Sequence, residues 1–161
     1  MLRKSHLTLL LILPFFMAGL MPAMATGSGK PEPSSPLVIR FTGLRNNEGQ
    51  IAIGITSQAE GWPRAPEHEY AWEKNGASDG VLEVTVPGLK PGTYAVTVLD
   101  DENSDLEMDM ILGLPREGWG FSNNPPFRIS VPRFEECAFR LEPGGSTITI
   151  ELRYAGGRKR D

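Results

Sequence analysis

Apolar and polar residues alternate along six stretches of the chain, and a period of two is typical of a β-strand that buries one face. The six stretches are 37–42, 51–56, 81–86, 93–101, 134–141 and 147–154. Turns rich in Gly, Pro and Asn separate most of them, as in LRNNEG after the first stretch and EPGGS before the last. The pattern predicts antiparallel strands joined by short connections.

We therefore expect an all-β fold, a single antiparallel β-sandwich of about six to eight strands. A small barrel is the alternative, because the alternation is the same when one sheet closes on itself. Residues 57–80 interrupt the pattern with Pro, Gly and charged residues around Trp62, Tyr70 and Trp72. Here we expect one short helix over 66–74, with the aromatic side chains buried against an edge or end of the sheet rather than stacked on a ligand.

The N-terminus has the three regions of a secretory signal peptide. Arg3 and Lys4 precede an apolar run over 7–20, and the small residues that follow predict cleavage after Ala25. The run is shorter than the roughly 20 apolar residues of a membrane-spanning helix, so we expect a periplasmic or secreted protein with no span after cleavage. Residues 26–36 are predicted to form a flexible leader, 37–154 the β-sandwich domain, and 155–161 a disordered basic tail.

Charge and cysteine content narrow the classes of function. The chain has a net charge of −4, and removal of residues 1–25 leaves 14 basic against 20 acidic residues. This balance argues against nucleic-acid binding, which requires a basic face. Cys137 is the single cysteine, so no intramolecular disulfide can form, and its place in an alternating stretch predicts a buried thiol rather than a reactive one.

One candidate site is the acidic loop after the fourth stretch. Oxygen-bearing side chains occur there at the spacing of the first half of a calcium-binding loop, at Asp101, Asn103, Asp105 and Asp109. Leu106 occupies the position where such loops have glycine, and Leu112 the position of their bidentate glutamate. Calcium is the predicted cofactor of this loop, and a solvated acidic loop without an ion is the alternative.

A second candidate site is the segment GWGFSNN. Trp119 and Phe121 could stack on a sugar or a peptide, with Asn123 and Asn124 as hydrogen-bonding partners. The alternative is structural: the neighbouring glycines allow a tight turn, the aromatic rings close one end of the sandwich, and the asparagines bond to backbone groups.

The sequence contains little catalytic machinery. No Gly-x-Ser-x-Gly motif occurs, and His68 is the single histidine after residue 25. A hydrolase would require His68 to lie beside Ser122 or Cys137. We therefore expect no enzyme, and we expect a monomeric binding or structural module with an unknown envelope or extracellular partner.

Two longer motifs, GLKPGTYAVTVLDDEN and LGLPREGWGFSNN, carry a resemblance. With them the chain resembles a family of exported bacterial proteins catalogued as domain of unknown function 2141, over residues 37–154. The resemblance implies an exported sandwich of transthyretin-like or immunoglobulin-like kind, and it implies no established activity. Many members read Asp-Glu-Asn-Gly-Asn-Gly-Lys-Leu-Asp in the acidic loop, whereas this chain reads DENSDLEMD, with Leu106 in place of the second glycine.

Overall fold

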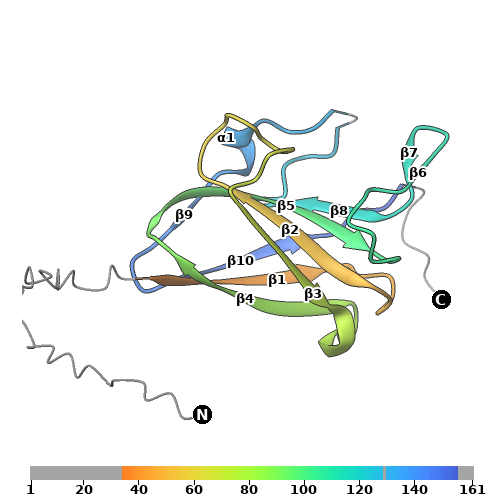
Figure 1. The fold of residues 1–161 in the computed structure, drawn as a ribbon, viewed down its shortest axis with the longest axis horizontal. Coiled ribbons are helices and arrows are strands. Elements are labelled where there is room, and N and C mark those ends of the chain that lie inside the picture. The colour runs from red at the N-terminus through yellow and green to blue at the C-terminus, as the bar shows by residue number, and fades with distance from the viewer. Residues whose placement is uncertain (1–33, 129, 156–161) are drawn as a thin grey trace, which may run out of the picture. The chain divides into compact units, whose positions relative to one another are not determined.

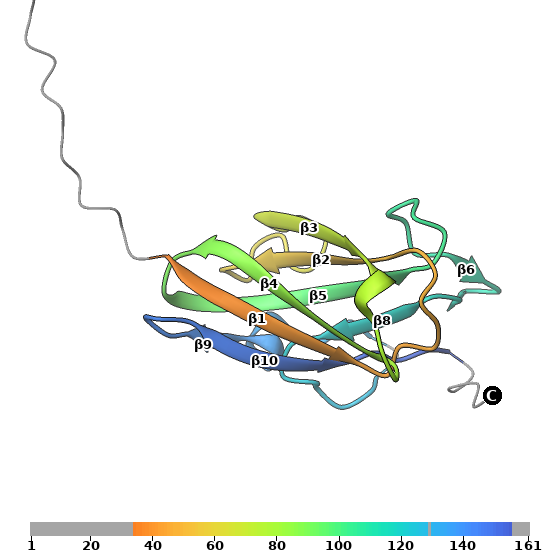
Figure 2. The same cartoon turned by 90° about the horizontal axis from the view of Figure 1, so that it is seen from below.

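The described residues form two stacked β-sheets (Figure 1, Figure 2). A computed structural model describes residues 34–128 and 130–155. The predicted signal peptide, nearly all of the predicted leader and the tail beyond Ala155 lie outside these residues. The expected all-β sandwich is confirmed, and the sheets do not close into a barrel.

One sheet has three strands and the other five. The first sheet contains β1 (Ser35–Thr42), β4 (Val81–Leu89) and β10 (Ser146–Glu151), in the order β10-β1-β4. The second contains β2 (Gln50–Thr56), β3 (His68–Glu73), β5 (Gly92–Asp101) and β8 (Gly118–Phe121), in the order β3-β2-β5-β8, and β9 (Phe139–Leu141) pairs with the start of β5. A separate hairpin consists of β6 (Met110–Ile111) and β7 (Leu114–Pro115). The helical elements are η1 (Lys74–Gly76) and α1 (Phe134–Cys137).

Most neighbouring strands are antiparallel, as expected, but β1 and β10 are parallel. Their register places Leu37 opposite Ser146 and Phe41 opposite Ile150. The alternation of apolar and polar residues is the same in both directions, so it could not distinguish the two arrangements.

The core lies between the two sheets and follows the alternation read from the sequence. Alternate residues of β1 and β2 are buried, and those of β5 from Tyr94 to Val98 face the same interior. The fully buried members include Leu37, Ile39, Phe41, Ile51, Ile55 and Val96. Each large apolar side chain of this kind contributes about 1.5–3 kcal/mol on burial, so the core is the main source of stability.

The helix expected over 66–74 is wrong, because residues 68–73 form strand β3 and the single helical turn nearby, η1, begins only at Lys74. β3 pairs antiparallel with β2, with Ile53 opposite Tyr70. Tyr70 and Trp72 are two positions apart and therefore share one face of a strand, where their rings stack at 5.6 Å and pack against the core. The expected burial of these two rings is thus correct, although the element that presents them is a strand.

The strand expected over 134–141 is interrupted at its start. Residues 134–137 form α1, whose first turn is held by a hydrogen bond from the backbone N–H of Arg133 to Glu136 Oε2 (2.9 Å), and only 139–141 form β9. Cys137 is a free thiol and fully buried, as expected, but it lies in α1 rather than on a strand.

Across the described ranges, no helix has the length and apolar character needed to cross a membrane.

Candidate functional site

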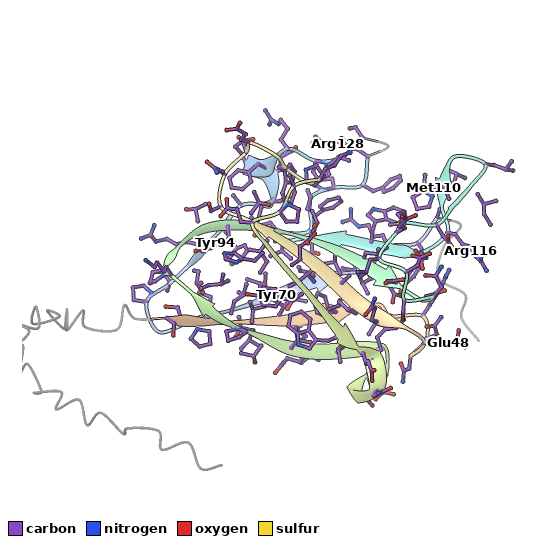
Figure 3. The ribbon with its side chains drawn as sticks, in the orientation of Figure 1. Glu48, Tyr70, Tyr94, Met110, Arg116 and Arg128 are labelled. Atoms are coloured by element: carbon purple, nitrogen blue, oxygen red, sulfur yellow. The ribbon has the colours of Figure 1, made fainter. Side chains whose placement is uncertain are left out.

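A groove of about 1060 Å³ runs along the outer side of β8. Trp119 and Phe121 of β8 form its floor, the β6–β7 hairpin forms one wall, and residues 125–128 and 130–132 form the other. Met110 and Arg128, labelled in Figure 3, come from these two opposite walls. Pro, Met and aromatic side chains are prominent in the lining, which suits a ligand with apolar groups, and Arg64, Arg128, Arg153 and Glu151 add charged groups.

Two glycines make β8 present its aromatic residues outward. A Cβ on Gly118 would lie 2.5 Å from Tyr154 Cε1, and one on Gly120 would lie 2.8 Å from Ile150 Cγ2. The inner face of β8 therefore has no room for side chains, and the alternate residues Trp119 and Phe121 point to the groove. The sequence suggested that these glycines serve a tight turn, but they serve a close packing contact.

Aromatic contacts hold the walls in place. The Phe121 ring lies 6.0 Å from that of Trp62, whose Nε1–H donates to the carbonyl oxygen of Pro132 at 2.9 Å. The Trp119 ring lies 6.4 Å from that of Phe127, which remains 65% exposed. Trp119 is half-buried, so one part of its ring supports the wall and the rest stays accessible to a ligand.

The two asparagines predicted as ligand partners do not line the groove. Asn123 Nδ2 donates to the carbonyl oxygen of Ala138 (2.6 Å). Asn124 donates to Thr149 O (2.9 Å), and its Oδ1 accepts from the backbone N–H of Glu151 (2.8 Å). Both asparagines adopt positive φ, which this residue type tolerates, so they shape the chain after β8. The structure brings Trp119 and Phe121 together and gives the asparagines backbone-binding roles.

Three of the four predicted calcium ligands lie close together in the acidic loop. Asp101 is fully buried, and its carboxylate accepts hydrogen bonds from Gln50 Nε2 (2.6 Å) and from the backbone N–H groups of Asp105 (3.1 Å) and Leu106 (3.0 Å). Asn103 Nδ2 donates to Asp105 Oδ2 at 2.9 Å. Leu106 adopts φ +64°, the left-handed conformation that the glycine of a calcium loop supplies.

The fourth predicted ligand is held elsewhere. Asp109 Oδ2 lies 3.6 Å from Arg116 Nη1, and the backbone N–H of Asp109 donates to the buried Glu117. Within residues 34–128 and 130–155, no group of three or more His, Cys, Asp or Glu side chains is placed to hold a metal ion. Calcium binding by this loop stays a prediction from the sequence.

A buried ion pair at the same end of the sandwich was not identified from the sequence. Lys74 Nζ lies 2.6 Å from Asp100 Oδ1, and both side chains have no exposed surface. Tyr154 donates its hydroxyl to Asp100 Oδ2 at 2.5 Å. Burial raises the pKa of Asp100, against the opposing effect of the hydrogen bonds from Lys74 and Tyr154. Burial and the adjacent Asp100 also raise the pKa of Tyr154 far above its usual value.

A second, half-exposed ion pair lies beside the buried one. Arg45 donates two hydrogen bonds to the Glu102 carboxylate, from Nε to Oε1 (2.5 Å) and from Nη2 to Oε2 (2.6 Å). Its guanidinium also lies 4.7 Å from the centre of the Tyr154 ring. Burial alone would raise the pKa of Glu102, but the hydrogen bonds and charge of Arg45 lower it below the usual value. The backbone N–H of Glu102 in turn donates to Glu117 Oε1 (2.9 Å).

The sequence did contain one signal for this network. Asp100 continues the inward phase of β5 after Tyr94, Val96 and Val98, and a carboxylate in a buried phase requires a partner. No sequence pattern indicates the burial of Lys74, which is the buried residue of η1.

The structure does not bring His68 to the proposed nucleophiles. His68 is opposite Ile55, Ile55 is opposite Val96, and the backbone N–H of Ser122 donates to Val96 O. Three strand spacings, roughly 14 Å, therefore separate His68 from Ser122. Ser122 Oγ donates to the carbonyl oxygen of Cys137 at 2.6 Å, and burial raises the pKa of the Cys137 thiol to about 11.

Comparison with known proteins identifies the family of the chain and gives no relative of known activity. No curated protein and no solved structure matches the chain. One family model matches residues 39–149, from the middle of β1 to the middle of β10. This match includes both long motifs, the acidic loop and β8. The chain therefore belongs to the bacterial family described as "Uncharacterized protein conserved in bacteria (DUF2141)".

Proposed function

We propose that the protein is an exported, non-enzymatic binding module that holds an apolar, extended peptide segment in the groove beside β8. The observation that carries this proposal is the groove itself, with a floor of Trp119 and Phe121 and apolar walls. Concave, mostly apolar surfaces with a rigid aromatic floor are the usual setting for ligand binding. The ring contacts with Trp62 and Phe127 fix the walls before a ligand arrives, which reduces the entropy cost of binding.

A peptide fits this groove better than a carbohydrate does. A sugar presents many hydroxyl groups, and each one that loses water on binding requires a hydrogen-bonding partner. The two side-chain amides that the sequence offered as sugar partners, those of Asn123 and Asn124, already bond to backbone groups and do not line the groove. The walls instead offer side chains such as Met110, Leu114 and Phe127, which complement apolar peptide side chains.

Fluorescence anisotropy of a labelled, extended peptide of alternating Leu and Ser tests the proposal. We expect saturable binding that weakens at least about tenfold in Phe127→Ala, because truncation of an aromatic side chain that anchors a ligand costs about 2 kcal/mol or more and about 1.4 kcal/mol already corresponds to a factor of ten. Phe127 is largely exposed, so its loss leaves the core intact. Thr85→Ala, on the exposed face of β4, is the matched control and should bind as the wild type does.

Two results would overturn the peptide proposal. One is the absence of saturable binding to the Leu/Ser peptide. The other is an unchanged affinity in Phe127→Ala. Titration with soluble chitin oligosaccharides covers the alternative, and saturable sugar binding in place of peptide binding would favour the carbohydrate hypothesis.

Export is supported by the basic, apolar and small-residue regions of residues 1–25. N-terminal sequencing of the protein from a periplasmic or culture fraction should begin at Thr26. A chain that retains Met1 and stays with the cytoplasm would contradict the proposed location.

A further inference from the structure

The exposed apolar side chains gather at one end of the molecule. In the described part of the chain, all of the exposed large hydrophobic side chains fall between residues 106 and 131: Leu106, Met110, Ile111, Leu112, Leu114, Phe127 and Val131. The β6–β7 hairpin, which carries four of them, projects away from the two sheets (Figure 1). Four of the seven, Met110, Leu114, Phe127 and Val131, line the groove. A gathering of exposed apolar side chains at a groove marks a site of interaction.

Leu112, at the tip of the hairpin, is an unfavourable residue for both its exposure to solvent and its turn conformation. Ile111 pairs with Leu114, so Leu112 and Gly113 form a two-residue turn with φ +50° and +79°. Such turns favour Asn or Asp before Gly, and a left-handed backbone costs leucine about 1–2 kcal/mol. Leu112 is also 99% exposed. A contact between this side chain and another molecule accounts for a leucine at this position.

The charges left over near the hairpin and in the groove differ in net sign. The loop that leads into the hairpin carries the exposed carboxylates of Asp105 and Glu107, while Asp109 and Arg116 pair with each other. The groove lining includes Glu151 together with Arg64 and Arg153, and neither of these two arginines forms an ion pair with another described residue. The hairpin of one copy would therefore bring carboxylates toward the arginines of the groove of another copy. The same carboxylates would be repelled by an anionic lipid surface.

We propose that the groove of each molecule receives the β6–β7 hairpin of a second copy, which produces a symmetric dimer. The hairpin forms one wall of its own groove, so the inserted surface and the receiving surface are neighbours. A two-fold axis through this end of the molecule can then satisfy both contacts at once. The inference rests on the proposed function, since the hairpin is itself an apolar extended segment. The proposed dimer differs from the monomer expected from the sequence, because the alternation of apolar and polar residues gives no information on assembly.

Sedimentation equilibrium of the mature protein, from low micromolar to near-millimolar concentration, tests the dimer. We expect a monomer–dimer equilibrium that weakens at least tenfold in Leu112→Asn, because asparagine suits the left-handed turn and removes only the apolar contact. Thr85→Asn, on the exposed face of β4, is the matched control and should dimerise as the wild type does. Arg64→Glu should weaken the dimer, and higher salt should weaken the wild-type dimer as well. A saturating concentration of the Leu/Ser peptide should dissociate it.

The outcomes separate this inference from the proposed function. A protein that remains monomeric at all concentrations and still binds the Leu/Ser peptide overturns the dimer and leaves the binding function in place. A dimer that Leu112→Asn and the peptide leave unchanged also overturns hairpin insertion. A monomer that binds no peptide overturns both proposals.

Discussion

Lys74→Met removes the cation of the buried ion pair and keeps an unbranched side chain of similar length. In the native protein Lys74 Nζ donates to Asp100 Oδ1 at 2.6 Å and to Asn46 Oδ1 at 3.1 Å, in a site with no solvent exposure. In the variant the Asp100 carboxylate keeps the Tyr154 hydroxyl as its remaining side-chain donor. It must then stay charged without a counter-ion or take up a proton.

The size of the loss follows from these two possibilities. Removal of one partner of a buried ion pair typically destabilises a protein by about 3–5 kcal/mol. Proton uptake by Asp100 sets an upper limit on the destabilisation that its unpaired carboxylate can cause. Protonation at pH 7 of a carboxyl group with an ordinary pKa of about 3.9 costs about 4 kcal/mol, at about 1.4 kcal/mol per pH unit. At pH 5 the same calculation gives about 1.5 kcal/mol. Since small domains unfold with about 5–15 kcal/mol, the variant should be marginal at pH 7 and partly recover at pH 5.

Urea denaturation at pH 7 and pH 5, followed by tryptophan fluorescence, measures this difference. Lys74→Met combined with Asp100→Asn is the control, because the amide still accepts from Tyr154 and carries no charge. The double variant should regain most of the stability lost by Lys74→Met at pH 7. A loss below about 1 kcal/mol in Lys74→Met at pH 7, or an equal loss at both pH values, would refute the argument that the unpaired carboxylate dominates.

Four further predictions concern the same end of the molecule. The pKa of Glu102 is lowered in the folded state, so its contribution to stability is present above the unfolded pKa of about 4.3 and disappears as pH falls through the lower folded pKa. Glu102→Gln should therefore flatten the acid limb of a curve of stability against pH, and equal slopes in variant and wild type would contradict this. Cys137, with a pKa of about 11, should stay unreactive toward a thiol reagent at pH 8 until urea unfolds the chain. Gly118→Ala should lower Tm by displacing the Tyr154 ring, at a cost of about 1–3 kcal/mol, and an unchanged Tm would argue against the close packing. The calcium hypothesis for residues 101–109 predicts a higher Tm with millimolar calcium than with chelator, and coincident melts would remove it.

The strands that bury one full face could be predicted from the sequence, because burial imposes a period of two on residue type. Ile51, Ile53 and Ile55 of β2 are the clearest case. The sequence predicts a helix in place of β3, because this strand lies among Pro and charged residues and buries only parts of Tyr70 and Trp72. A strand at the edge of a sheet, with two half-buried rings, leaves a weak alternation.

The groove could be predicted only in part. Trp119 and Phe121 were identified by composition, since aromatic residues beside glycines suggest a specific role. The walls depend on the approach of the hairpin and of residues 125–128 and 130–132, which lie on either side of β8 in the chain and have no periodic pattern. The burial of Lys74 could not be predicted for a related reason, since it depends on Asp100, a distant residue on strand β5.

The parallel pairing of β1 with β10 determines when the chain can finish folding. β1 lies between β4 and β10, and its register joins Leu37 to Ser146, so the first strand waits for the last. A chain that emerges N-terminus first, from a ribosome or a membrane pore, keeps one edge of β1 unpaired until nearly all of its length has appeared. Such a late, long-range contact slows folding and extends the time during which β1 can pair with another chain. A protein of this topology is most vulnerable to aggregation before β10 has emerged and paired with β1.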